Sequence, residues 1–408
     1  MSPWSIALRN VTRNPRRSVL TGCVVTFGFC AFALAGGFMS QSLEGLRDGT
    51  IRGGIGHLQF ADPAAFAEGA ATTAGGGLTD APGIAAILAA DPAVAEVLPR
   101  LEFTGLVAAG DRSVPFLGTG LDPAAEARVM DAPRLVVEGA WLGARSDRAL
   151  VLGTGLAAAL SVRVGDTVTL MTTTRDGTLN AVDAPVAGLA RVPFRELNDR
   201  YLATTLDLAA DLLANRDGAS KIVVVLKDGR GAPAALPRLL GSLAAGGHAI
   251  AGWTWIDLAP FYRQVRTLYL GIFGFMGALL VVMVLLASAN TMMMAVGERV
   301  REIGTLRALG TRARFIRRLF LAEGLVLGIG GCLAGALLSL VVRFALNHSG
   351  IVLPPPPGGV EGSVLHVRIY AAAYGAGALA MILTLAAASW LPARRATRLR
   401  IVEALAHV

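Results

Sequence analysis

The chain alternates between long apolar segments, which carry few or no charges, and polar segments. Four apolar segments lie at 18–43, 267–297, 319–346 and 369–391. Each is long enough to cross a bilayer core of about 30 Å as a helix that rises about 1.5 Å per residue. We therefore predict an α-helical membrane protein with four transmembrane helices.

The first apolar segment could be a retained helix or a cleavable signal peptide. A cleavable signal peptide is the alternative for 18–43, because residues 33–35 (ALA) resemble a cleavage site. Its length favours a retained helix, since the apolar part of a signal peptide is only about 7 to 15 residues.

The segment 267–297 is longer than one bilayer requires, so we expect its outer end to project as a stalk.

The polar stretch 44–266 lies between the first and second apolar segments and has the composition of a globular domain. Alternating and β-branched runs predict strands at 56–60, 103–108, 114–118, 162–172, 221–226 and 249–255. Helical spacing of apolar residues predicts helices at 83–90, 155–160, 205–214 and 233–245. We expect an α+β extracytoplasmic domain of two subdomains, with the second inserted between about 131 and 215.

Arginine is concentrated in three of the remaining segments, which sets the expected orientation. The loop 298–318 carries seven arginines, and both the amino-terminal segment 1–17 and the tail 392–408 are arginine-rich. Positive charge is retained on the cytoplasmic side. Both termini and this loop are therefore predicted inside, with 44–266 and the loop 347–368 outside. Glu323 and Arg343 lie near the ends of the third apolar segment and are expected to snorkel to the interfaces.

The arginine-rich loop begins with a stretch that has helical periodicity. Within 298–310, Ile303, Leu306 and Leu309 follow one another at helical spacing, and Gly310 is placed to end a helix. A short amphipathic helix of this kind lies on a membrane or docks in a groove of another protein. The alternative is a solvated loop that only sets the topology.

Composition narrows the functional class. With 54% hydrophobic residues and a mean hydropathy of +0.57, the chain is too apolar for an ordinary soluble protein. The net charge of +8 comes mostly from arginines that flank membrane segments, which favours contact with anionic lipid over nucleic acid. The three cysteines, Cys23, Cys30 and Cys332, all lie in apolar segments, so no disulfide is expected in 44–266.

The sequence lacks the motifs of familiar enzymes. There is no GxxxxGK[ST] phosphate loop, no HExxH, no CxxC and no GxSxG, and the five histidines are scattered. We therefore predict no catalytic, cofactor-binding or metal-binding residues on this chain. Glycines spaced for close helix packing occur in the third apolar segment, where they are expected to line a seam within the bundle or between protomers. These are Gly324, Gly328, Gly331 and Gly335.

Four sequence stretches, in this order of segments, resemble the FtsX/MacB-type family of ABC transporter permeases. They are ALRNVTRNPRRSVLT at 7–21, GHLQF at 56–60, ERVREIGTLRALGTRARFIRRLFLAEG at 298–324 and PARRATRLRIVEAL at 392–405. Within this family the likeness is greatest to the lipoprotein-releasing, Lol-type permeases. It runs over nearly the whole chain, and the loop motif is its most specific part.

The resemblance implies an assembly in the bacterial inner membrane with the large domain in the periplasm. Two permease protomers, identical or paralogous, would each dock the loop helix into a separately encoded ATPase. ATP and Mg would bind that ATPase, and no cofactor would bind this chain. The residues implied in the ATPase contact are Glu298, Arg301, Glu302, Ile303, Leu306, Arg307 and Leu309.

The function implied is ATP-driven extraction or export of an amphiphile, with lipoprotein release from the inner membrane as the leading candidate. The alternative is a mechanotransmission scaffold that regulates an extracytoplasmic enzyme, such as a cell-wall hydrolase, without transport. A membrane-anchored enzyme is a third hypothesis, for which 44–266 shows no catalytic constellation. No long extra hairpin matches the chaperone-binding hook of one Lol subtype, which puts a periplasmic lipoprotein carrier as a partner in doubt.

Overall fold

The computed structural model describes the chain in five stretches and divides it into two compact units. The described residues are 3–13, 15–63, 77–174, 176–354 and 363–398. A helical unit comprises Met1–Glu44, Val265–Val352 and Val364–Val408. An α+β unit comprises Gly45–Gln264 and Leu353–Ser363. The external domain was predicted at 44–266.

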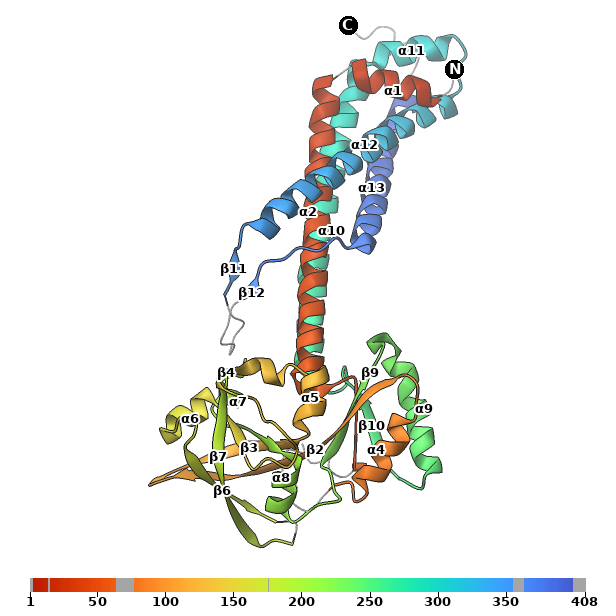
Figure 1. The fold of residues 1–408 in the computed structure, drawn as a ribbon. Helices are drawn as coiled ribbons and strands as arrows, with labels where there is room; N and C mark the ends of the chain where they lie inside the picture. Colours follow the sequence, from red (N-terminus) through yellow and green to blue (C-terminus); the bar gives the residue numbers. More distant parts are fainter. Residues whose placement is uncertain (1–2, 14, 64–76, 175, 355–362, 399–408) are drawn as a thin grey trace. The chain divides into compact units, whose positions relative to one another are not determined.

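Within the described part of the chain, six helices belong wholly or largely to the helical unit (Figure 1). They are α1 (Pro3–Arg13), α2 (Pro15–Thr50), α10 (Pro260–Glu298), α11 (Val300–Ala308), α12 (Ala313–His348) and α13 (Ala371–Arg398). Among the described residues, α2, α10, α12 and α13 are long and apolar enough to cross a membrane. This confirms the predicted four long apolar helices. Pro15 begins α2, a position where proline's missing N–H costs nothing.

The helical core forms where α2, α12 and α13 approach closely. A Cβ added at Gly331 would lie 2.7 Å from Val25 on α2, and one at Gly335 would lie 2.7 Å from the carbonyl oxygen of Thr26. A Cβ at Gly324 would collide with the Ser389 hydroxyl on α13. These three glycines therefore pack helices within one chain. Gly328 has no atom closer than 3.6 Å to an added Cβ and leaves room for a methyl group.

In the described parts of Gly45–Gln264, the α+β unit has ten strands and several short helices. The strands are β1 (Leu58–Ala61), β2 (Val94–Ala109), β3 (Arg112–Leu121), β4 (Val136–Gly139), β5 (Leu150–Gly153), β6 (Thr167–Thr173), β7 (Leu179–Ala190), β8 (Tyr201–Thr205), β9 (Lys221–Leu226) and β10 (Ala251–Thr254). The helices are η1 (Ile51–Ile55), α4 (Ala81–Ala89), α5 (Pro123–Val129), η2 (Ala132–Leu135), α6 (Thr154–Leu160), α7 (Arg195–Asn198), α8 (Leu206–Leu213), η3 (Gly229–Gly231) and α9 (Ala232–Ala245). Two further strands pair in the segment between α12 and α13, β11 (Val352–Leu353) and β12 (Ser363–Val364).

Six of the ten strands close into a barrel. Strand β2 pairs with β3, the order continues through β8, β5 and β7, and β6 returns from β7 to β2. The β3–β8 and β5–β7 pairs are parallel and the others are antiparallel. The barrel encloses an apolar core that includes Phe103, Phe116, Leu152, Leu170 and Leu202. Helices α6 and α8 pack against this barrel.

Strand β4 pairs with β7 at the barrel, and three further strands form a second lobe. Strands β10, β1 and β9 continue the sheet from the first half of β2, and α4 and α9 pack together on this part (Figure 1). Its core is separate from that of the barrel and includes Leu58, Phe60, Ile84, Leu88 and Leu239. Two subdomains were expected, and two separate cores are found.

The strand β2 belongs to both lobes. Its residues 94–100 pair with β9, whereas residues 101–109 pair with β3 in the barrel. The inserted subdomain therefore begins within β2, near Arg100, well before the predicted start at about 131. The prediction was wrong because one uninterrupted strand passes from one core to the other without a turn or a linker.

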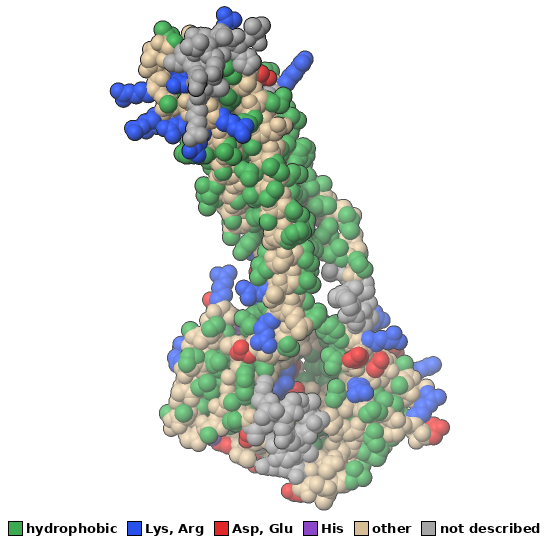
Figure 2. Space-filling model, turned by 180° about the vertical axis from the view of Figure 1, so that it is seen from behind, with side chains coloured by type: hydrophobic (Ala, Val, Ile, Leu, Met, Phe, Trp, Pro, Cys, Tyr) green, Lys and Arg blue, Asp and Glu red, His purple; other side chains and the backbone are tan. Residues whose placement is uncertain are grey.

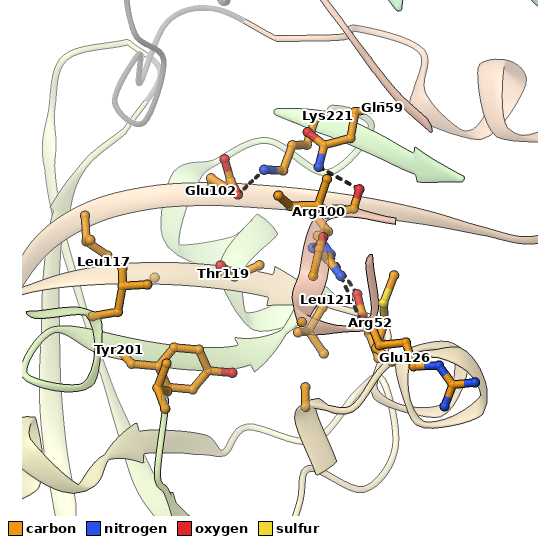
Figure 3. Close-up of a pocket in the computed structure, with 18 of the residues that line it drawn as sticks. Arg52, Gln59, Arg100, Glu102, Leu117, Thr119, Leu121, Glu126, Tyr201 and Lys221 are labelled. Atoms are coloured by element: carbon orange, nitrogen blue, oxygen red, sulfur yellow. Dashed lines mark hydrogen bonds and ion pairs between the residues drawn. The ribbon is translucent and has the colours of Figure 1, made fainter. Parts of the chain in front are cut away.

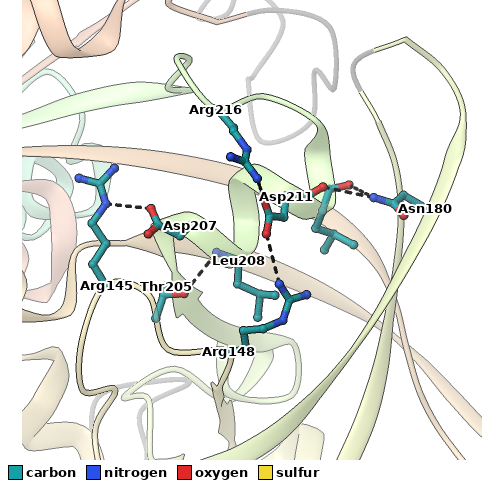
Figure 4. A network of polar contacts seen from close by, with 9 residues as sticks. Arg145, Arg148, Asn180, Thr205, Asp207, Leu208, Asp211 and Arg216 are labelled. Atoms are coloured by element: carbon teal, nitrogen blue, oxygen red, sulfur yellow. Dashed lines mark hydrogen bonds and ion pairs between the residues drawn. The ribbon is translucent and has the colours of Figure 1, made fainter.

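A polar network surrounds helix α8, whose buried side chains belong to the barrel core (Figure 4). Arg145 forms an ion pair with Asp207 at 2.9 Å. Asp211 forms ion pairs with Arg148 at 3.2 Å and with Arg216 at 2.9 Å. The Thr205 hydroxyl also caps the helix by accepting from the Leu208 N–H. Exposed ion pairs of this kind contribute only about 0–1 kcal/mol each, so the network orients α8 more than it stabilises it.

The chain enters and leaves the α+β unit at one apolar cluster. Ile51, which follows α2 directly, packs with Trp255 and Ala259, which precede α10. Gly54 has φ = 130° and Gly56 has φ = 70°, backbone conformations that favour glycine. A Cβ on Gly56 would also collide with Val223. These glycines allow the chain to turn sharply from α2 into β1.

Matched substitutions on α12 test the packing role of the glycines. We expect Gly331→Ala to lower the free energy of unfolding by about 1–3 kcal/mol, because the added methyl group overlaps Val25. Gly328→Ala should be neutral or stabilising by up to about 1 kcal/mol, because alanine favours a helix. Unfolding of the purified protein in detergent would measure both. Equal stability of the two variants would show that the seam is loosely packed.

Candidate functional site

The helix α11 stands apart from the two long helices that flank it. Helix α10 ends at Glu298, and Arg299 leaves the helical conformation with φ = −112° and ψ = 13°. The chain then forms α11, Val300–Ala308, and Gly310 at φ = 87° ends it before α12 begins. A short helix with a glycine stop was predicted here, and the structure confirms it.

One face of α11 is buried against the helical unit itself. Ile303 is 5% exposed and packs with residues from α10, α12 and α13, namely Val296, Ile316, Phe320 and Ala393. Val300 and Gly304 are buried on the same face. Ile303 therefore packs on its own chain, and its predicted contact with an ATPase stays a prediction. Helical spacing reveals an apolar face but does not tell whether it packs on its own chain or on a partner.

The opposite face of α11 is exposed and combines apolar and charged groups. Leu306 is 39% exposed and Leu309 is 79% exposed, while Arg301 and Glu302 are also on the surface. Glu298 is exposed and Arg307 is half-buried. Figure 2 shows basic side chains projecting around the end of the helical unit that carries α1 and α11. A short helix with exposed leucines on one side can dock in a groove of another protein or lie on a membrane surface.

A buried carboxylate holds α11 in place. Glu323 on α12 is 2% exposed, and its Oε1 accepts hydrogen bonds from Asn10 Nδ2 at 2.5 Å and from Arg299 Nη1 at 3.0 Å. This contact joins α1, the corner between α10 and α11, and α12. The expectation that Glu323 snorkels to the interface is therefore wrong, because an intramolecular cation satisfies its charge inside the unit.

A second candidate site is a cavity of about 330 Å³ in the α+β unit, beside the point where β2 passes between the lobes (Figure 3). Arg100 binds Glu126 through two hydrogen bonds of 2.7 and 2.9 Å and donates a third to the carbonyl oxygen of Gly54. Lys221 contacts Glu102 at 2.5 Å. The charges on this part of the wall are therefore paired with one another.

The rest of this cavity wall is largely apolar. Leu117, Thr119 and Leu121 alternate along β3 and present one face to the cavity, and Phe103 and Met130 add to it. Burial raises the pKa of Tyr201 to about 12, so its phenol stays protonated at neutral pH. The cavity has the size of a small-ligand site. Sequence motifs gave no sign of it, because its residues come from segments far apart in the chain.

Two features of the described residues bear on metal binding and on titration near neutral pH. No group of three or more His, Cys, Asp or Glu residues is placed to hold a metal among those residues. His57 Nδ1 accepts the backbone N–H of Leu226 at 3.1 Å. Burial and then the charge of Arg47 lower the pKa of His57, so it is neutral at pH 7 and serves the fold.

Two known protein families match this chain. The MacB-like periplasmic core domain matches residues 18–240, more than half of the chain, and the FtsX-like permease C-terminal family matches residues 271–401. The chain belongs to the FtsX/MacB-type permease family. The predicted family is thereby confirmed, together with a multi-pass membrane protein that carries an α+β domain of the MacB periplasmic type.

Individual relatives match at low identity. The lipoprotein-releasing system protein LolE of Haemophilus influenzae is 26% identical over 63% of this chain and 62% of its own length. LolC of Xylella fastidiosa is 27% identical over 64% of each chain. The ABC transporter permease YtrF of Bacillus subtilis is 34% identical over 32% of this chain and 31% of its own. This chain thus spans somewhat less than two thirds of the Lol relatives.

The two faces of α11 predict opposite responses to the same substitution. Ile303→Asp should unfold the protein at a lower temperature, because it removes burial of about 1.5–3 kcal/mol and buries a charge. Leu306→Asp should change stability by less than about 0.5 kcal/mol, since its side chain is already exposed to solvent. Thermal unfolding of the purified chain in detergent measures both. Similar losses in the two variants would argue against the buried face assigned to α11.

Proposed function

We propose that a separate ABC-type ATPase docks on the exposed face of α11, and that ATP hydrolysis there drives the movement of an amphiphilic substrate. The observation that supports this most directly is the division of α11 into a face fixed to its own bundle and a face open to a partner. Leu306 and Leu309 would supply the apolar contact, with Arg301 and Glu302 around it. ATP and Mg would bind the ATPase, and this chain would need no cofactor.

The attachment of α11 gives a physical route for force. Ile303 and the Arg299–Glu323 pair fix α11 to the ends of α10 and α12. A push on its exposed face is therefore transferred to those helices rather than absorbed by a flexible loop. Helix α10 is continuous over 39 residues, or about 58 Å, and can carry the displacement along its whole length.

The arginine asymmetry supports one orientation in a bacterial inner membrane. Both termini and α11 would lie in the cytoplasm, where an ATPase is found, and the α+β unit would lie in the periplasm. Basic side chains around α1 and α11 would face the anionic lipids of the cytoplasmic leaflet (Figure 2).

A second permease protomer, identical or paralogous, would complete the transporter. Only 6% of the most apolar window of α10 is buried within the chain, and Leu268, Phe275 and Leu286 are exposed on it. Nothing lies within 4 Å of a Cβ added at Gly271 or Gly274. Small residues on an open apolar face favour close approach of another helix.

The names of the relatives suggest the substrate class. Two of them are lipoprotein-releasing system proteins, and a shorter match of 35% identity over 28% of this chain is a pyoverdine export protein of Pseudomonas putida. We infer that the substrate is an amphiphile, with lipoprotein released from the inner membrane as the leading candidate. The cavity in the α+β unit favours handling of a ligand over a purely mechanical scaffold.

Leu306→Asp tests the docking of the ATPase. The variant should lose binding of the ATPase that co-purifies with the protein, and ATP turnover in the reconstituted complex should fall to that of the ATPase alone. The reason is that a charge would replace the apolar contact at the centre of the exposed face.

A leucine elsewhere serves as the control. Leu179 is 76% exposed in the α+β unit, so Leu179→Asp should leave ATPase binding and turnover unchanged. If Leu306→Asp also keeps normal binding and stimulated turnover, the ATPase does not dock on this face.

Reporter fusions test the orientation. An enzyme active only outside the cytoplasm should be active when fused after Gly120 or Asn215, in the α+β unit, and silent when fused after Ala313, at the start of α12. Activity at Ala313 would overturn the proposed topology.

A further inference from the structure

A second, polar cavity adjoins the cavity of Figure 3. Its volume is about 490 Å³, and both cavities are lined by Arg52 and Met130. Five cationic side chains line the second cavity against two carboxylates. The cations are Arg47, Arg52, Arg128, Arg134 and Lys227, and the carboxylates are Asp48 and Asp131.

Three of these cations are already paired. Arg47 contacts Asp48 at 2.8 Å, Arg134 contacts Asp131 at 3.1 Å, and Arg128 contacts Glu96 at 2.8 Å.

Two cations remain without a carboxylate in the described part of the chain. Lys227 Nζ donates to the carbonyl oxygen of Pro92 at 2.8 Å, and Arg52 is exposed with no ion-pair partner among those residues. His57, on the same wall, is neutral and does not change this balance. The polar cavity therefore has an excess of positive charge at Arg52 and Lys227, which favours an anion.

The polar cavity also lies close, along the chain, to an apolar helix. Arg47 follows the uncharged segment 18–43 by four residues within the continuous helix α2. Four residues of helix span about 6 Å, which is close to the thickness of one headgroup layer, about 5–8 Å. An anionic headgroup at the end of the apolar segment would therefore lie close, along the helix, to Arg47, which lines this cavity.

The first cavity offers what an apolar tail requires. Four charged residues of its wall form two ion pairs, Arg100 with Glu126 and Lys221 with Glu102. The apolar part of the wall includes Phe103, Leu117 and Met130. An apolar chain placed there would contact that wall without separating an ion pair. Arg52, shared by both cavities, stands where the polar and the apolar parts of such a molecule would meet.

We propose that the two cavities form one binding site for an anionic amphiphile. Its phosphate or carboxylate head lies between Arg52 and Lys227, and its apolar tail lies along the β3 face that carries Leu117 and Thr119. The proposal deepens the proposed function, on which it rests, by assigning the substrate a negative headgroup and a place in the α+β unit. A free phosphate ion would share the head chemistry but would leave the apolar wall unused.

The test measures binding of single-chain lipids to the full-length protein in detergent by native mass spectrometry. The probes are lysophosphatidic acid, zwitterionic lysophosphatidylcholine and inorganic phosphate. Arg52→Gln/Lys227→Gln removes the unpaired cations, with Arg163→Gln, an exposed arginine outside both cavities, as its control. Thr119→Trp fills the apolar cavity, with the exposed Thr173→Trp as its control. Thermal unfolding verifies that each variant is folded.

The proposal predicts a distinct pattern across probes and variants. Arg52→Gln/Lys227→Gln should weaken lysophosphatidic acid binding at least tenfold and leave lysophosphatidylcholine binding unchanged. Thr119→Trp should weaken lysophosphatidic acid binding at least fivefold, and both controls should bind like the unmodified chain. The proposal is overturned if neither variant affects lysophosphatidic acid. It is also overturned if inorganic phosphate displaces the lipid fully and Thr119→Trp has no effect, which would indicate a free-phosphate site.

This experiment separates the site from the proposed function because it requires no ATPase. Lysophosphatidic acid binding that neither variant affects would reject the amphiphile site. If Leu306→Asp still abolishes ATPase binding, the permease assignment stands. The converse result, lipid binding without any effect of Leu306→Asp, would leave the site and remove the proposed ATPase contact.

Discussion

The helical unit depends on one buried carboxylate. Glu323 has almost no access to solvent and is neutralised by Arg299, with Asn10 as a second donor. A buried charge that loses its partner typically costs about 3–5 kcal/mol, so these three groups cannot separate independently. The carboxylate thereby fixes α1 and the α10–α11 corner on α12. The orientation of α11, and with it the identity of the face left open, follows from this contact.

The α+β unit also has a buried ion pair where several elements meet. Arg100 lies where β2 passes from one core to the other, and it contacts both Glu126 on α5 and the carbonyl oxygen of Gly54, just after α2. Apolar side chains could fill this space with equal or greater stability. The bidentate pair, however, admits only one geometry and so defines how the two lobes meet the end of α2. In both units a buried ion pair marks the end of a long helix.

Hydropathy and periodicity in the sequence predicted the main elements of the fold. The four long apolar helices, the two-core α+β domain and the short helix α11 are found as expected. Strands such as β5 (Leu150–Gly153) and β8 (Tyr201–Thr205) were missed because they are too short to show alternation and are buried on both faces. The subdomain boundary was missed because β2 continues through Pro99 and Arg100 as one paired strand, so no turn marks the boundary.

The limits of prediction at the candidate sites share a physical cause. Whether Ile303 faces its own bundle or a partner, and whether Glu323 reaches solvent or Arg299, depends on which residues tertiary folding brings nearby. Local spacing specifies a face but not its neighbour. The cavities are the extreme case, since Arg52, Phe103 and Leu117 line one cavity although they lie far apart in the sequence.

The same residues that turn the chain out of α2 also line the cavities. Ile51 is packed on Trp255 and Ala259, and the residues that follow it, Arg52, Gly53 and Gly54, form part of the first cavity wall. Ala259 directly precedes α10, whose other end joins α11 through Arg299. Helix α10 is one continuous helix from Pro260 to Glu298. In the proposed function, a displacement of α11 would be passed to α10 and from there along the chain to the residues that line the proposed binding site.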